Sequence, residues 1–252
     1  MEKNILINED DREVITITID RPQKGNAFTP EMIDTLTAYL QEITESQSGR
    51  LILIMSNGDH FCTGADLEWM RSSLSLSEED NRNDAKRLAD LYFTIYNCDI
   101  PTICMVQGAV YGGGLGIAAC SDIVIAAESA QFCFSEVKLG LAPATISPYI
   151  VKAIGSRLAL YHFLLADEFD TEIALKMGLV HEQVDINRLE LRTQEIVDKL
   201  LINDSEAMLR IKRLVRTIEP IDEGLCEDTV DLIAKLRQGE NAQKRLKKFL
   251  SK

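Results

Sequence analysis

Three consecutive glycines, Gly112, Gly113 and Gly114, stand between an apolar run at residues 102–106 and small, apolar residues at 115–120. Consecutive glycines let the backbone approach another group closely and adopt a positive φ. Because residues 115–120 have the composition of a buried helix, the glycines would open its N-terminus, where free N–H groups favour negative charge. Such N–H groups can bind an anion or stabilise a developing oxyanion, although a plain tight turn is the simpler alternative.

The residues around the glycines argue against two common nucleotide sites. No Lys-Ser or Lys-Thr pair follows them, as a Walker loop would require. Their GGGxG spacing and late position also fit a dinucleotide fingerprint poorly. The functional groups that this motif can offer are therefore its backbone N–H donors.

A second glycine loop repeats the same order of elements. The apolar run at residues 51–56 leads into a loop that carries Gly64 and Asp66, and the loop passes into a short helix. We expect Asp66 to cap that helix or anchor the loop rather than act as an acid. Two such loops can supply two preorganised donors to one developing negative charge.

Periodicity predicts the elements that position these loops. Alternating or continuous apolar runs predict strands at 14–19, 51–56, 102–106, 123–127 and 182–184, with a short strand and loop in 130–137. Helical patterns cover 30–43, with Thr29 as N-cap, and 85–97, 147–154, 157–165, 171–177, 188–201, 205–217, 225–236 and 242–250. Polar residues 71–84 are the candidate for a mobile lid.

The order of these predicted elements indicates an α/β fold, with a core at residues 1–186 and a helical region at residues 187–252.

Composition excludes several classes of function. The 252 residues are 46% hydrophobic and carry a net charge of −13, which argues against nucleic acid or an anionic membrane as partner. No apolar run is long enough to span a bilayer, and the N-terminus lacks a secretory signal, so we expect a cytoplasmic protein. Six cysteines, of which Cys104, Cys120 and Cys133 sit in apolar segments and the others are scattered, then predict buried free thiols. Three histidines without a CxxC pair predict no metal site.

Four motifs in order carry a resemblance to a known family. They are Asn26-Ala27-Phe28, Phe61-Cys62-Thr63-Gly64-Ala65-Asp66-Leu67, Gly112-Gly113-Gly114 and Phe134-Ser135-Glu136-Val137-Lys138-Leu139-Gly140-Leu141. Their order and spacing resemble the crotonase (enoyl-CoA hydratase/isomerase) superfamily. The resemblance implies a spiral of ββα units with a C-terminal helical trimerisation region, a homotrimer or dimer of trimers, and an acyl-CoA substrate. It implies no cofactor besides the coenzyme A of the substrate.

The resemblance also assigns residues to the site. It implies that the N–H groups of Ala65 and Gly113 form an oxyanion hole for the thioester oxygen and that Glu136 is catalytic. It implies substrate contacts from Lys24, Ala27, Gly64, Asp66, Leu67, Gly112, Gly116 and Leu141. Lys24 and the cluster Lys244, Arg245, Lys247 and Lys248 are candidates for the coenzyme A phosphates, with a solvated basic helix face as the alternative.

One departure from the family pattern affects the expected reaction. Hydratases of the family carry two glutamates, and the first would stand at position 116, where this chain has Gly116. A single carboxylate suffices to move a proton between two carbons, as the Δ3-Δ2 isomerases do. Residues 64–70 and 135–150, however, look like hydratases of methylglutaconyl-type, branched acyl-CoAs. We therefore favour a hydratase, with an isomerase or a non-catalytic acyl-CoA binder as alternatives.

Overall fold

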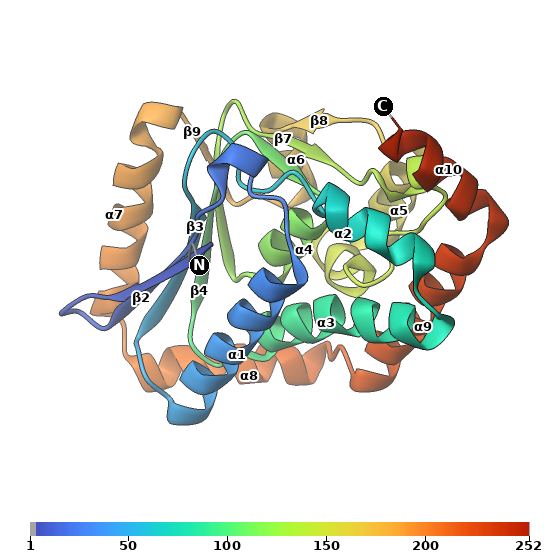
Figure 1. The fold of residues 1–252 in the computed structure, drawn as a ribbon. Coiled ribbons are helices and arrows are strands. Elements are labelled where there is room, and N and C mark those ends of the chain that lie inside the picture. The colour runs from blue at the N-terminus through green and yellow to red at the C-terminus, as the bar shows by residue number, and fades with distance from the viewer. Residues whose placement is uncertain (1–3, 252) are drawn as a thin grey trace.

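A six-stranded sheet lies toward one side of the computed structural model, which describes residues 4–251 (Figure 1). The strands in sheet order are β1 (Ile5–Glu9), β2 (Val14–Ile19), β3 (Leu51–Ser56), β4 (Thr102–Val106), β6 (Ile123–Ala127) and β9 (Glu182–Val184). β1 pairs antiparallel with β2, and the other neighbours pair parallel. The strand β1 was not predicted, because its sequence mixes apolar and polar residues over only five positions.

Helices cover both faces of this sheet, and the strands alternate between two apolar cores. Ile15, Ile17 and Ile54 face α1 (Pro30–Ser46), α3 (Glu78–Asn97) and α4 (Gly113–Cys120). Leu53 and Ile103 face the opposite core, where α7 (Leu189–Ile202) packs alone at the edge of the molecule (Figure 1). A strand buried on both faces must be apolar throughout, as the sequence of β3 is. The C-terminal region therefore supplies one layer of the core through α7.

A second, smaller sheet runs beside the first and closes the spiral. It consists of β5 (Ala109–Tyr111), β7 (Gln131–Cys133) and β8 (Phe169–Asp170). Two isolated bridges, Phe28 with Ala65 and Cys62 with Val110, continue the same layer. Each turn of the chain thus contributes a long strand, a short strand or bridge, and then a helix. This is the repeated unit that the glycine loops indicated.

The remaining helices agree closely with the predicted patterns. They are α2 (Leu67–Ser72), α5 (Ser147–Leu165), α6 (Thr171–Met177), α8 (Ser205–Ile218), α9 (Glu223–Gln238) and α10 (Glu240–Leu250). α5 joins two predicted helices across Gly155, whose φ of +78° breaks the helical geometry. Short 3-10 turns include η2 (Ser73–Ser75) and η3 (Glu136–Leu139). The predicted helical boundaries from α6 to α10 are correct to within two residues.

The segment predicted as a polar lid is more ordered in its secondary structure than expected. α3 begins at Glu78, seven residues before the predicted helix, and Asn81 and Asp84 within it are buried. The Asn81 side chain donates to the carbonyls of Ser73, Leu76 and Ser77 at 3.2–3.4 Å. Buried polar side chains with partners replace the apolar stripe that marks a helix in sequence.

All six cysteines carry free thiols, and five of them are buried, in agreement with their apolar surroundings in the sequence. Within residues 4–251, no helix combines the length and apolarity needed to cross a membrane. The same part of the chain holds no group of three or more His, Cys, Asp or Glu side chains that could hold a metal ion. Residues 1–3, on which the signal-peptide expectation partly rests, lie outside the described residues.

Candidate active site

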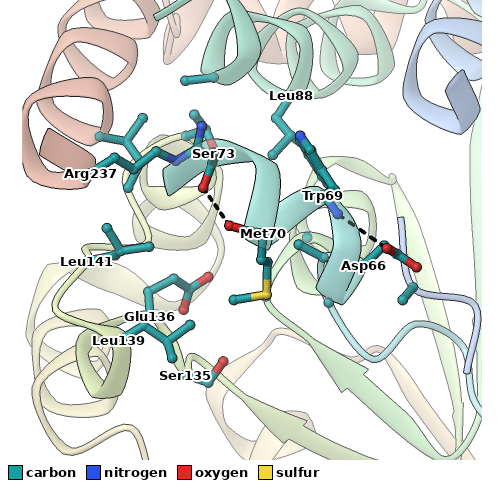
Figure 2. A pocket seen from close by; sticks show the side chains of 18 of the residues that line it. Asp66, Trp69, Met70, Ser73, Leu88, Ser135, Glu136, Leu139, Leu141 and Arg237 are labelled. Atoms are coloured by element: carbon teal, nitrogen blue, oxygen red, sulfur yellow. Dashed lines mark hydrogen bonds between the residues drawn. The ribbon is translucent and has the colours of Figure 1, made fainter. Parts of the chain in front are cut away.

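A cavity of about 540 Å³ brings the motif residues together. Ten of the residues predicted for the site line it: Lys24, Ala27, Gly64, Ala65, Asp66, Leu67, Gly112, Gly113, Glu136 and Leu141. Its walls come from α2, α3, η3 and the first turn of α4. The last two helices also contribute, through Ile233, Arg237, Leu246 and Phe249. Figure 2 shows Glu136, Leu141 and Arg237 along one side of α2, with Trp69 and Asp66 on its other side.

Gly116 is the predicted site residue that does not line the cavity. A Cβ at this position would lie 2.5 Å from Tyr92 Cε1 and 2.6 Å from Ile146 Cγ2. Tyr92 and Ile146 themselves line the cavity. Gly116 is thus buried against these two side chains, outside the cavity lining, and its contact with substrate stays a prediction.

Two backbone N–H groups at the cavity lack protein acceptors. The Phe28 N–H donates to the Gly64 carbonyl at 2.8 Å, and the Asp66 N–H donates to the Phe28 carbonyl at 2.9 Å. This bridge fixes Ala65 between them. Gly113 is the first residue of α4, so its N–H has no intrahelical acceptor. Within residues 4–251, neither the Ala65 nor the Gly113 N–H donates to a protein acceptor. Both are therefore available to an oxygen in the cavity.

Gly112 lies between the loop that carries Gly64 and the Glu136 carboxylate. Its φ of +48° belongs to the region that favours glycine, and its N–H donates to the Cys133 carbonyl at 3.2 Å. A Cβ on Gly112 would lie 3.3 Å from Glu136 Oε1 and 3.9 Å from the Gly64 Cα. A side chain would therefore crowd the carboxylate. These distances place the three motifs around one point.

Glu136 has the environment of a proton-transfer group. Its Oε2 is buried and has no hydrogen-bond partner among the described residues 4–251. Burial raises the pKa of this carboxyl from 4.5 to about 7, against a smaller lowering by its own backbone N–H. Figure 2 shows the carboxylate pointing from η3 toward Met70. A carboxyl with a pKa near neutrality can both accept and donate a proton at physiological pH.

Asp66 positions the Ala65 loop, as its predicted capping role requires. Asp66 Oδ1 accepts from the Glu68 and Trp69 N–H groups at 2.8 and 3.3 Å, at the N-terminus of α2. Its Oδ2 accepts from Arg21 Nη1 at 2.7 Å, and Arg21 also donates to the Ala27 carbonyl at 3.0 Å. Although burial raises the pKa of Asp66, these hydrogen bonds outweigh it and lower the pKa. An ionised, fully engaged carboxylate is a structural anchor rather than an acid.

The roles of several supporting residues were missed, including that of Asn26, which stands in one of the four motifs. Asn26 is fully buried with a φ of +55°, and its side chain donates to the Asn57 and His60 carbonyls at 2.8 and 2.6 Å. It fixes the loop that carries Lys24 and Ala27. An asparagine beside a glycine was a recognisable signal for such a positive-φ turn.

A buried ion pair on the cavity wall was also missed. Trp69 Nε1 donates to Asp84 Oδ1 at 2.7 Å, and Arg237 Nη1 donates to Asp84 Oδ2 at 2.8 Å. Trp69, Asp84 and Arg237 come from α2, α3 and α9 and all line the cavity. No short-range pattern links residues this far apart in sequence.

The basic cluster lies on α10, outside the cavity lining. Leu246 and Phe249 of the same helix do line the cavity, so α10 turns its apolar face inward. Lys244 Nζ pairs with Glu240 at 2.9 Å, within the helix. A role for this cluster in binding phosphates stays a prediction, as does that of Lys24.

Comparison with known proteins decides the family. The sequence model of the enoyl-CoA hydratase/isomerase family matches residues 9–252. The chain belongs to this family. A crystal structure from Legionella pneumophila, described as an enoyl-CoA hydratase/isomerase (crotonase), superposes with a TM-score of 0.82. It shares 40% identity, over 98% of this chain and 96% of that one. The predicted crotonase fold is thereby confirmed.

Two curated relatives show the range of reactions in the family. An enoyl-CoA hydratase of Alternaria alternata is 33% identical over 203 residues, which are 80% of this chain and 66% of the relative. The chain thus spans slightly less than two thirds of that relative. A 1,2-epoxyphenylacetyl-CoA isomerase of Escherichia coli is 29% identical over 85% of this chain and 82% of its own length. Family membership therefore supports a hydratase or isomerase role without choosing between them.

Proposed function

We propose that the chain hydrates a 2-enoyl-CoA thioester, with Glu136 as the proton-transfer group. The observation that carries this proposal concerns residues 4–251, among which Glu136 Oε2 is buried without a hydrogen-bond partner at the cavity where the Ala65 and Gly113 N–H groups also have no acceptor. The predominance of hydratases among the more similar named relatives supports the same reaction. The substrate class proposed is a branched, methylglutaconyl-type enoyl-CoA, on the resemblance of residues 64–70 and 135–150.

The reaction can be written with one carboxylate. Ionised Glu136 accepts a proton from water as the oxygen bonds to C3 of the enoyl group. The electron pair of the C2–C3 double bond forms a double bond between C1 and C2, and the carbonyl π pair moves onto the thioester oxygen. The Ala65 and Gly113 N–H groups stabilise that oxyanion, each contributing roughly 3 kcal/mol. Glu136 then returns the proton to C2, which regenerates the thioester and the ionised carboxylate. Atoms and charge balance without a second acid.

A Δ3-Δ2 isomerase is the alternative, and the closed space at Gly116 favours it. Isomerisation needs a single group that removes a proton from one carbon and returns it to another. A side chain at Gly116 would meet Tyr92 and Ile146, so α4 offers no second carboxylate to hold water. A non-catalytic acyl-CoA binder is disfavoured by the environment of Glu136, which a binder would not need.

Product analysis separates these reactions. The purified protein is incubated with crotonyl-CoA, a 3-enoyl-CoA and 3-methylglutaconyl-CoA, and the products are separated and weighed by mass spectrometry. Hydration adds the mass of one water, whereas isomerisation changes retention without changing mass. Isomerisation of the 3-enoyl-CoA without hydration of the other two would overturn the proposal. No conversion of any substrate would leave acyl-CoA binding as the function.

Glu136→Gln tests the role of the carboxylate in either reaction. This variant keeps the shape of the side chain but accepts no proton, so turnover should fall by roughly a hundredfold to ten-thousandfold. Acyl-CoA affinity, measured by calorimetry, should change little. Glu68→Gln is the matched control, because Glu68 lines the same cavity but is exposed on α2. If Glu136→Gln keeps more than about a tenth of the native turnover, the base lies elsewhere.

A further inference from the structure

The space beside the first turn of α4 is filled by an aromatic ring. Tyr92 lies on α3, is fully buried, and lines the cavity. Its Cε1 and Cζ lie 2.5 and 2.6 Å from the position of a Cβ on Gly116. Contacts this short do not occur between a real Cβ and its neighbours, so any side chain at position 116 requires the ring to move.

The ring is held too firmly to move at low cost. The Tyr92 hydroxyl donates to the Gly113 carbonyl at 3.1 Å. The ring packs edge-on against Tyr149, with 6.2 Å between the centroids. Burial raises the pKa of the Tyr92 phenol well above its usual value, so the group stays neutral and remains a donor to Gly113. Because side chains in a protein interior are closely packed, displacing the Tyr92 ring would lower the stability of the fold.

We propose that Tyr92 is a specificity-determining residue, whose ring occupies the space of a side chain at position 116 and so keeps a second carboxylate out of the site. The proposal rests on the proposed function in taking Glu136 as the proton-transfer group. Two carboxylates can hold one water between them, whereas one carboxylate beside an aromatic ring shuttles a single proton. Tyr92 thereby limits the site to one carboxylate, Glu136, whichever reaction the oxyanion donors serve.

A thermal-unfolding cycle tests the filled space independently of activity. Gly116→Ala is made in three backgrounds: native, Tyr92→Phe and Tyr92→Leu. Tyr92→Phe keeps the ring and loses only the hydroxyl, so it is the matched control. Gly116→Ala should lower Tm by roughly 5 °C in the native and Tyr92→Phe backgrounds. In the Tyr92→Leu background the loss should largely disappear, because Ile146 can then shift into the vacated space. An equal loss in all three backgrounds would overturn the proposal.

A pair of double variants tests the consequence for the reaction. Tyr92→Leu with Gly116→Glu restores a second carboxylate, and Tyr92→Leu with Gly116→Gln is its uncharged control. Hydration of crotonyl-CoA should be at least about tenfold faster in the glutamate variant, the low end of acid–base contributions. Equal hydration rates in the two double variants would show that Tyr92 does not limit the reaction by excluding a second carboxylate. If the native chain converts no enoyl-CoA while the thermal cycle behaves as expected, the proposed function fails and the exclusion by Tyr92 stands.

Discussion

At the residue scale, the raised pKa of Glu136 has two opposite consequences for pH. Its pKa of about 7 in the folded chain means that the ionised form, which the proposed reaction requires as the proton acceptor, accumulates only as pH rises through neutrality. We expect kcat/KM to rise with pH and to level off above about pH 7. Measuring kcat/KM from about pH 5 to about pH 9 checks this rise. A kcat/KM that is constant from about pH 5 upward would contradict it.

The contribution of Glu136 to folding stability should decrease as pH rises, while the reaction rate increases. Because the folded pKa lies above the ordinary value of 4.5, the fold favours the protonated carboxyl. Native stability relative to Glu136→Gln should therefore fall as pH rises from 4.5 through about 7. Urea unfolding of both proteins at about pH 5 and about pH 8 measures this difference. The same difference at both values would mean that the carboxyl titrates normally in the fold.

Gly113 should not tolerate a side chain, for a reason that the structure corrects. The sequence interpretation allowed for a forbidden backbone angle, but the positive φ belongs to Gly112 rather than Gly113. A Cβ on Gly113 would instead lie 3.0 Å from Phe28 Cδ2 and from the Tyr92 hydroxyl oxygen. Gly113→Val should fold yet lose at least about a hundredfold in turnover, as for loss of an oxyanion donor. Gly224→Val, in the first turn of α9, is the control, and near-normal turnover of Gly113→Val would place the oxyanion site elsewhere.

The sequence predicted which motif residues would meet better than it predicted the side chains around them. Glu136, Ala65 and Gly113 stand in short motifs, so the order and spacing of the motifs sufficed to predict that these residues line one cavity. Tyr92 lies 24 positions before Gly116, inside an ordinary amphipathic helix, and its pattern marks only a buried residue. The sequence shows that position 116 carries no glutamate, but it does not show that the Tyr92 ring occupies the space of a side chain at that position.

At the element scale, the link between α2 and α3 should be mobile over a shorter stretch than the predicted 71–84. Asn81 holds the preceding turn, and Asp84 is paired with Trp69 and Arg237. Amide exchange should therefore be fast near residues 74 and 75, which Asn81 does not bond, and slow from Asn81 onward. Exchange measured by mass spectrometry resolves the two stretches. Uniformly fast exchange through residue 84 would restore the longer lid.

The boundaries of elements could be predicted where an apolar stripe or a cap defined them. Thr29 caps α1 as expected, accepting from the Met32 N–H at 3.3 Å. The first turns of α3 lack such a stripe because Asn81 and Asp84 are buried through hydrogen bonds, and the cap at Ser77, which accepts from the Asp80 N–H at 3.1 Å, was missed. Amphipathic patterns also showed that α10 has an apolar face, but not that Leu246 and Phe249 would face the cavity.

At the scale of the whole molecule, the exposed face of α8 indicates self-association. Ile211, Leu214, Val215 and Ile218 form one stripe and are 50–69% exposed. Apolar surface of this kind on a single chain usually marks an interface. We expect a homotrimer or a dimer of trimers, measured as mass by light scattering at micromolar concentration. Leu214→Glu should shift that mass toward the monomer.

A control for this prediction lies on another helix. Leu191 of α7 is 58% exposed and stands outside the α8 stripe. Leu191→Glu should leave the mass unchanged. A native protein that is monomeric at micromolar concentration would show that the α8 stripe has another purpose.

The position of α9 and α10 on the cavity wall also bears on how the protein folds. Lys24 and Leu246 line the same cavity although 222 positions separate them in the chain. Contacts between residues so distant in sequence form late, because closing a long loop costs conformational entropy before the contact stabilises the fold. We therefore expect acyl-CoA binding to appear only with the last phase of refolding after dilution from urea. Binding that appears with the first phase would contradict this order.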